Sequence, residues 1–282
     1  LMAFQAPILS EVLAQGQDRV VIQNEFIRII VDQSGEVCRE TYFVKKDKSW
    51  IEILESGSPL RSDPSIKQNG KLIPLKSASI SQGSEEGEAV IVRESSGKGV
   101  ASKSITLRKG EPFARVMITY RTGGNIRLES FWSTYSFAPG GKRYAAYKPL
   151  DFVWTPQLRP EQEHIIADHT FRSPALMMQK GGYFAALVPV LTDVDGKGRQ
   201  IRTVADLQVE TADRPFFSIG LQNWIPEPYR LRNTHVFYVA PDSLASTVSD
   251  TTLTLSYLLF LRADAPKREG YREIVRYHWL TS

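Results

Sequence analysis

Hydrophobic and polar residues alternate along the chain in short runs, and the clearest run lies between residues 103 and 120. Ile105 and Leu107 alternate with polar neighbours, residues 109–112 read Lys-Gly-Glu-Pro, and the alternation then resumes as far as Tyr120. A period of two residues places successive side chains on opposite faces of a strand, and glycine and proline favour turns. This pattern predicts a β-hairpin.

Similar runs follow one another at short intervals, separated by polar turns rich in glycine such as 83–87 and 96–99. Many short strands joined by such turns are typical of an antiparallel sandwich or barrel. We therefore predict an all-β fold, a large antiparallel sandwich over residues 1–265, with one small hairpin between 55 and 75. The other predicted strands are 20–23, 26–31, 36–44, 50–54, 78–82, 89–94, 102–108, 114–120, 126–137, 164–171, 176–179, 183–190, 201–209, 215–221, 236–239 and 253–261.

Helical spacing appears near the two ends of the sequence. Apolar residues within 7–14 are spaced as in a short amphipathic helix that covers a sheet edge. Near the other end, Pro266 stands where a first helical residue is favoured. We predict a C-terminal helical extension over residues 266–282, with an apolar stripe formed by Tyr271, Ile274, Val275 and His278.

Composition narrows the class of protein. The chain has 282 residues, of which 42% are hydrophobic and 23% charged, as in ordinary globular proteins. The excess of four positive charges is spread along the chain, so a basic face for nucleic acid is not expected. No apolar run reaches the ~18 residues of a membrane span. Cys38 is the single cysteine, which excludes an internal disulfide, and its place in a predicted strand favours an inert buried thiol.

Two long segments, 138–163 and 222–232, combine proline with aromatic residues, and the first also contains two adjacent glycines. Proline and glycine oppose regular structure, while the aromatic residues are too apolar for a disordered linker. We predict ordered loops over a sheet, and loops of this kind often carry function.

The layout resembles the β-supersandwich, or galactose-mutarotase-like, domain found at the front of many glycoside hydrolases and polysaccharide lyases. The resemblance is carried by VVIQNEFIRIIVDQSGEV, SITLRKGEPFARVMITY, KGGYFAALVPV and LTLSYLLFLRADAPKREGYREIVRYHW. It implies a sandwich that forms one wall of a sugar cleft, and a C-terminal α-helical domain that supplies most of the chemistry. It also implies a periplasmic or secreted location, and an isolated chain that is not catalytic by itself.

Sugar rings present apolar C–H faces and hydroxyl rims, so their sites pair aromatic planes with polar or charged groups. The two loops offer such a set, unless their aromatic residues serve only to anchor the loops to the sheet. The candidate sugar-binding residues are Arg143, Tyr144, Tyr147, Asp151, Trp154, Asn223, Trp224 and Tyr229.

A self-sufficient aldose epimerase would need a carboxylate base and an imidazole acid on opposite sides of one sugar ring. The candidates are His164, His169 and Glu227, although the resemblance would place an acid immediately before Gln222, where none stands. Ordinary hydrogen-bonded histidines are the alternative. Residues 193–198 begin like a calcium loop, but Val204 replaces the required twelfth-position glutamate. We therefore expect no metal and no cofactor.

The sequence thus predicts a carbohydrate-associated module that binds an oligo- or polysaccharide, placed at the front of a glycoside hydrolase or lyase-like enzyme. Two alternatives remain open at this stage. One is a stand-alone epimerase, and the other is a structural interaction domain.

Overall fold

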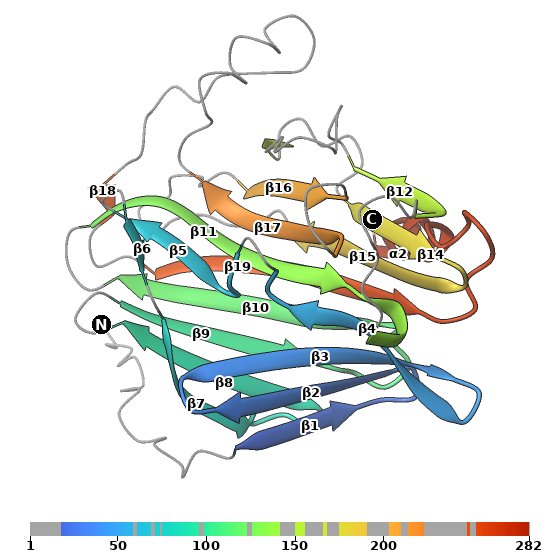
Figure 1. The fold of residues 1–282 in the computed structure, drawn as a ribbon, viewed down its shortest axis with the longest axis horizontal. Helices are drawn as coiled ribbons and strands as arrows, with labels where there is room; N and C mark the ends of the chain where they lie inside the picture. The colour runs from blue at the N-terminus through green and yellow to red at the C-terminus, as the bar shows by residue number, and fades with distance from the viewer. Residues whose placement is uncertain are drawn as a thin grey trace, which may run out of the picture.

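The computed structural model describes residues 18–58, 61–68, 71–73, 75–95, 99–122, 126–141, 150–155, 166–167, 175–190, 203–209, 214–222, 247–248 and 252–281. This part of the chain forms two antiparallel sheets that face each other, with one helix beside the second sheet (Figure 1). The predicted all-β sandwich is confirmed.

The first sheet is built mainly from the N-terminal strands and from strands later in the chain that pair with β11. Its central path runs in the order β1 (Arg19–Gln23), β2 (Ile27–Ser34), β3 (Val37–Lys46), β4 (Ser49–Ser56), β11 (Ile126–Phe137), β17 (Phe216–Gln222), β16 (Thr203–Gln208) and β13 (Ile166–Ala167). Strands β5 (Ser65–Gln68) and β18 (Thr247–Val248) also pair with β11, and β6 (Lys71–Ile73) pairs with β5. The short 3-10 helix η1 (Pro139–Gly141) follows β11.

The second sheet contains the predicted hairpin at its centre. Its order is β12 (Phe152–Trp154), β14 (Leu176–Lys180), β15 (Tyr183–Val190), β19 (Thr252–Arg262), β10 (Phe113–Thr122), β9 (Gly99–Thr106), β8 (Glu88–Ser95) and β7 (Lys76–Gln82). Strands β9 and β10 pair from Thr106 with Arg115 to Gly99 with Thr122. The period-two pattern of residues 103–120 therefore gave the correct hairpin.

The main hydrophobic core lies between the two sheets and explains the alternation in the sequence. In β2, Ile27, Ile29 and Val31 are fully buried, while the residues between them are partly exposed. Burying one such side chain stabilises the fold by about 1.5–3 kcal/mol. A strand with one face in this core and one face near solvent must alternate, and most strands of the chain do.

A second apolar cluster covers part of the opposite face of the second sheet. Strands β15 and β19 have long continuous buried runs, because α2 (Arg272–Thr281) packs on their outer face. Ile274 is 2% exposed there, and Tyr277 packs against the same cluster. At Gly270, immediately before this helix, a Cβ atom would lie 2.2 Å from the ring of Phe184, so the chain approaches the sheet as closely as glycine allows.

The helix corrects two details of the prediction. It begins at Arg272 and not at Pro266, because residues 267–271 form turns in which the amide of Glu269 donates to the carbonyl of Pro266. The stripe is also displaced, since Val275 is 56% exposed. Ile274 faces the sheet as predicted, and Tyr277 packs there beside it in place of Val275.

Most predicted strands within the described ranges are present; some have the predicted bounds, and in most others the ends differ by one to three residues. The loop predicted over 55–75 holds the expected small hairpin, in which Ile66 pairs with Ile73. The predicted helix at 7–14 and the strand at 236–239 lie outside the described residues. Among the residues that are described, no helix is long and apolar enough to cross a membrane.

Candidate functional site

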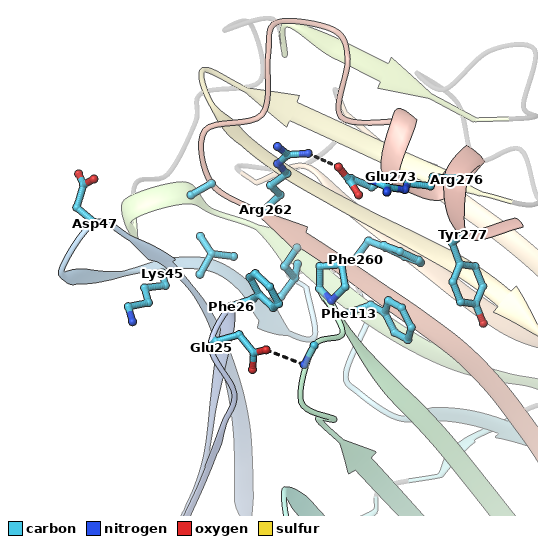
Figure 2. Close-up of a pocket in the computed structure, with 15 residues that line it drawn as sticks. Glu25, Phe26, Lys45, Asp47, Phe113, Phe260, Arg262, Glu273, Arg276 and Tyr277 are labelled. Atoms are coloured by element: carbon cyan, nitrogen blue, oxygen red, sulfur yellow. Dashed lines mark hydrogen bonds and ion pairs between the residues drawn. The ribbon is translucent and has the colours of Figure 1, made fainter. Parts of the chain in front are cut away.

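A hollow of about 690 Å³ opens where the turns at one end of the sandwich meet α2, and we call it the end pocket (Figure 2). The β1–β2 turn, the end of β3, the β9–β10 turn, the end of β19 and α2 all contribute to its walls. Its lining residues are Glu25, Phe26, Val44, Lys45, Asp47, Gly110, Pro112, Phe113, Phe260, Leu261, Arg262, Ala263, Glu273, Arg276 and Tyr277.

Aromatic rings form the apolar part of the end pocket. The ring centroid of Phe113 lies 4.7 Å from that of Phe260 and 5.1 Å from that of Tyr277, so these three rings pack as one group. Phe26 is 43% exposed, and Figure 2 shows it on the side of the pocket opposite Tyr277. The pocket therefore offers an accessible aromatic face backed by a rigid aromatic cluster.

Charged side chains surround these rings. Arg262 NH1 lies 2.5 Å from Glu273 Oε1, which ties β19 to α2, and the Gly110 amide donates to Glu25 Oε1 at 2.7 Å. Both interactions are drawn in Figure 2. Lys45 and Arg276 also line the pocket. A ligand here would meet an apolar face together with carboxylates and cations.

A second hollow, of about 630 Å³, lies at the other end of β3, and we call it the arginine cleft. It sits where β3 begins and β4 ends, next to the connection that follows β4. Its lining residues are Glu36, Val37, Cys38, Arg39, Glu55, Ser56, Gly57, Ser58, Arg61, Ser62, Asp63, Leu75, Arg93, Ser136 and Arg214.

A buried group of charges lies between the sheets beneath this cleft. The ammonium of Lys103 on β9 is 2.6 Å from Glu40 Oε2 and 2.5 Å from Asp63 Oδ2, and all three residues are almost fully buried. Asp63 also accepts hydrogen bonds from the hydroxyl of Ser133, at 2.6 Å, and the amide of Thr134, at 3.2 Å. These bonds compensate for the loss of water around the charges.

Tyrosine hydroxyls complete the network. Tyr42 donates to Glu40 Oε2 at 2.8 Å, and the hydroxyls of Tyr135 and Tyr257 are 2.6 Å apart. The Lys103 ammonium also lies 4.8 Å from the ring centroid of Tyr135. The network joins strands of both sheets through the middle of the core.

Burial sets the protonation of this region. Loss of solvation raises the pKa of Glu40, an effect that the Lys103 ammonium opposes. The carboxylates of Asp63 and Glu40 outweigh the desolvation of Lys103 and raise the pKa of its ammonium, which therefore stays charged. Desolvation likewise raises the pKa of Tyr135. At neutral pH, a charged lysine thus lies among neutral tyrosines.

Cys38 is buried, as the sequence predicted. Desolvation is the largest effect on its thiol and raises the pKa to about 11, against a smaller opposing effect of Arg93. A thiol with this pKa is almost entirely protonated near neutrality and is a poor nucleophile.

A further polar group lies on β11, β16 and β17. Arg61 NH1 is 2.6 Å from Asp206 Oδ2 and 3.3 Å from Ser218 Oγ, and its guanidinium stacks 4.6 Å from the ring centroid of Trp132. The hydroxyls of Thr134 and Ser218 are 2.9 Å apart. Asp206 is fully buried, and Arg61 lines the arginine cleft. The ion pair between them therefore holds Arg61 in position in the wall of the cleft.

Two of the sugar-binding candidates lie within the described residues. Asp151 Oδ2 accepts a hydrogen bond from the Gly181 amide at 2.6 Å, and its Oδ1 lies 3.7 Å from Lys180 Nζ, so this carboxylate holds the β14–β15 turn. Trp154 is 45% exposed on β12 at the edge of the second sheet. Neither residue lines the end pocket or the arginine cleft.

The other candidates lie outside the described residues, and they remain predictions. They are Arg143, Tyr144, Tyr147, His164, His169, Asn223, Trp224, Glu227 and Tyr229. The segment compared with a calcium loop lies outside as well. Within the described ranges, no three histidine, cysteine, aspartate or glutamate side chains are grouped as a metal site would require.

No protein-family model matches the sequence, and no curated protein matches it either. Among solved structures, the chain is similar to the α-N-acetylgalactosaminidase NagBb from Bifidobacterium bifidum in complex with GalNAc, with 10% identity and a TM-score of 0.39. That match covers 92% of this chain and 39% of the enzyme, so this chain spans about two fifths of its length. A galactose mutarotase related enzyme from Lactobacillus acidophilus is similar at 8% identity with a TM-score of 0.43, over 88% of this chain and 99% of that one. These similarities concern the fold alone.

The sequence analysis did not predict the buried charged residues, although their positions in the alternating pattern of the strands indicate burial. Lys103 is two residues from the buried Ile105, so both side chains point to the same face of their strand. In the same way, Glu40 shares a face with Cys38 and Tyr42, and Arg93 shares one with Ile91. Each charged residue therefore occupies a core-facing position of an alternating strand. Three such positions, one in a strand of the first sheet and two in neighbouring strands of the second, indicate a buried ionic network, because an isolated buried charge is too costly.

Proposed function

We propose that this chain is a carbohydrate-associated module that binds a sugar in the end pocket, at the front of a glycoside hydrolase or lyase-like enzyme. The observation that carries the proposal is the exposed ring of Phe26 in a pocket that is also lined by Tyr277, by carboxylates and by arginines. An aromatic plane stacks on the C–H face of a sugar ring, and ionised side chains accept or donate hydrogen bonds at its hydroxyl rim.

The size of the pocket agrees with this chemistry. Its volume of about 690 Å³ falls within the range of small-molecule sites, about 300–1,000 Å³. Because α2 forms one wall, a domain that continued from this helix would lie beside the bound sugar. This arrangement fits a module that shapes a cleft while another part of the protein performs the reaction.

The solved structures named above are a glycosidase in complex with GalNAc and a galactose mutarotase related enzyme. We therefore choose galactose, N-acetylgalactosamine and neutral galacto-oligosaccharides as the first ligands to test, with cellobiose as a glucose-based comparison.

The test compares two exposed aromatic residues of similar exposure, Phe26 at 43% and Trp154 at 45%. Binding of the sugar panel to the wild type, F26A and W154A is measured by titration calorimetry. We expect F26A to weaken binding about tenfold, which equals ~1.4 kcal/mol, and W154A to leave it unchanged.

Urea unfolding of both variants serves as the control for folding. If no sugar of the panel binds the wild type, the proposed function is wrong. If W154A loses binding and F26A does not, the sugar lies at the loops predicted from the sequence and the end pocket is not the site.

A further inference from the structure

The arginine cleft has a chemistry that sugar binding in the end pocket does not use. Four arginines and three carboxylates line it, which leaves one positive charge in excess. The two hollows contact opposite ends of β3, so each can be tested without the other. The arginines are Arg39, Arg61, Arg93 and Arg214, and the acids are Glu36, Glu55 and Asp63.

Arg93 enters the cleft from the second sheet and is only 8% exposed. Its NH1 donates to the carbonyl of Asp63, and its NH2 donates to the carbonyl of Cys38 at 3.2 Å. Its Nε is buried without a hydrogen-bond partner among the described residues. Buried donors in native proteins are almost always paired, so this N–H calls for an acceptor that the described chain does not provide.

Arg39 and Arg214 share a single carboxylate. Arg39 Nε lies 2.9 Å from Glu55 Oε1, and Arg214 NH1 lies 2.5 Å from Glu55 Oε2. Each guanidinium carries five N–H donors, so one contact with Glu55 leaves further donors for a second acceptor. Two cations that share one anion also attract another negative charge.

We propose that the arginine cleft binds a monoanionic ligand through its carboxylate, with Arg93 and Arg214 as the principal donors. The planar guanidinium matches the two oxygens of a carboxylate. The single excess charge is balanced by a monoanion, whereas a dianion such as phosphate would leave a net negative cleft. The volume of about 630 Å³ exceeds that of a bare carboxylate, which points to a small organic acid or an acidic sugar.

The experiment measures binding of galacturonate, acetate, galactose and inorganic phosphate to the full chain by titration calorimetry at low and high salt. We expect saturable binding of galacturonate that weakens with salt, because this ligand carries a charge. Neutral galactose binds in the end pocket, so its binding should not depend on salt. Equal affinity for acetate and galacturonate would support recognition of the carboxylate alone. Tighter binding of galacturonate would support an acidic sugar as the source.

Variants with opposite expected effects separate a binding role from a structural one. R214Q should weaken galacturonate binding about tenfold, because one charged donor is lost. E55Q should tighten it, because the carboxylate that competes for Arg39 and Arg214 is removed. R19Q is the matched control, since Arg19 on β1 pairs with Asp32 on β2 at 3.4 Å and does not line the cleft.

The proposal is overturned if galacturonate and acetate both fail to bind, if phosphate binds more tightly than either, or if E55Q weakens binding. None of these results bears on the sugar panel in the end pocket, and loss of neutral sugar binding in F26A leaves the present proposal intact.

Discussion

Lys103 is the residue on which the buried network depends, because its ammonium is the cation between Glu40 and Asp63. Removing one partner from a buried ionic group leaves an uncompensated charge, which typically costs about 3–5 kcal/mol. We expect K103M to lower the free energy of unfolding by about that amount, measured by equilibrium urea unfolding.

The control for this prediction is K76M on β7. Lys76 pairs with Glu36, but both side chains are about two-thirds exposed, and such surface pairs contribute only about 0–1 kcal/mol. If K103M and K76M unfold at the same urea concentration, the core network does not stabilise the fold.

The Cys38 thiol makes the stability of the fold depend on pH in the alkaline range. Its pKa rises from 9.0 to about 11 in the folded state, so its contribution to stability is complete below pH 9 and is lost as the pH rises toward 11. At about 1.4 kcal/mol for each pKa unit, the contribution is about 2–3 kcal/mol. Urea unfolding below pH 9 and near pH 11 measures it.

The raised pKa values of Tyr42 and Tyr135 also make the fold less stable as the pH rises. The contribution of the thiol is therefore found by comparing the wild type with C38A. We expect C38A to lose less stability than the wild type between these two pH values. An identical loss in both proteins would show that the thiol does not titrate in this range.

Helix α2 covers the outer face of part of the second sheet, so that β15 and β19 are buried on both faces. I274A should cost about 2–5 kcal/mol, because the side chain is 2% exposed in the outer apolar cluster. V275A, one residue further on, removes a side chain that is 56% exposed and should change stability by less than about 0.5 kcal/mol. Urea unfolding of the two variants makes the comparison, and equal losses would mean that α2 is not packed as described.

The elements differ in how well the sequence predicted them. The strands with one solvated face, such as β2 and β9, follow from their alternation, and β11 and β15 were predicted with their full bounds, Ile126–Phe137 and Tyr183–Val190. The predicted start of α2 was wrong, because residues 267–271 form turns, and Gly270 among them lies close against the ring of Phe184. Such a contact leaves no trace in a local pattern.

At the scale of the whole molecule, the sandwich could be predicted and its two hollows could not. Phe26 and Tyr277 lie far apart in the sequence. They line the same pocket only because the β1–β2 turn and α2 reach the same end of the sandwich. The arginine cleft likewise brings Arg93 of the second sheet against Cys38 of the first. Periodicity fixes which face a residue takes, but not which distant strand it meets.

The position of β19 has a consequence for how the chain folds. The last strand in the sequence lies between β10 and β15, and its Phe260 pairs with Phe113 of β10. Until the ribosome has released residue 262, β10 and β15 each present an unpaired edge, and such edges invite pairing with other chains. Contacts this distant in sequence also form slowly. During synthesis, the second sheet therefore closes last, and a nascent chain stalled before β19 would be prone to aggregate.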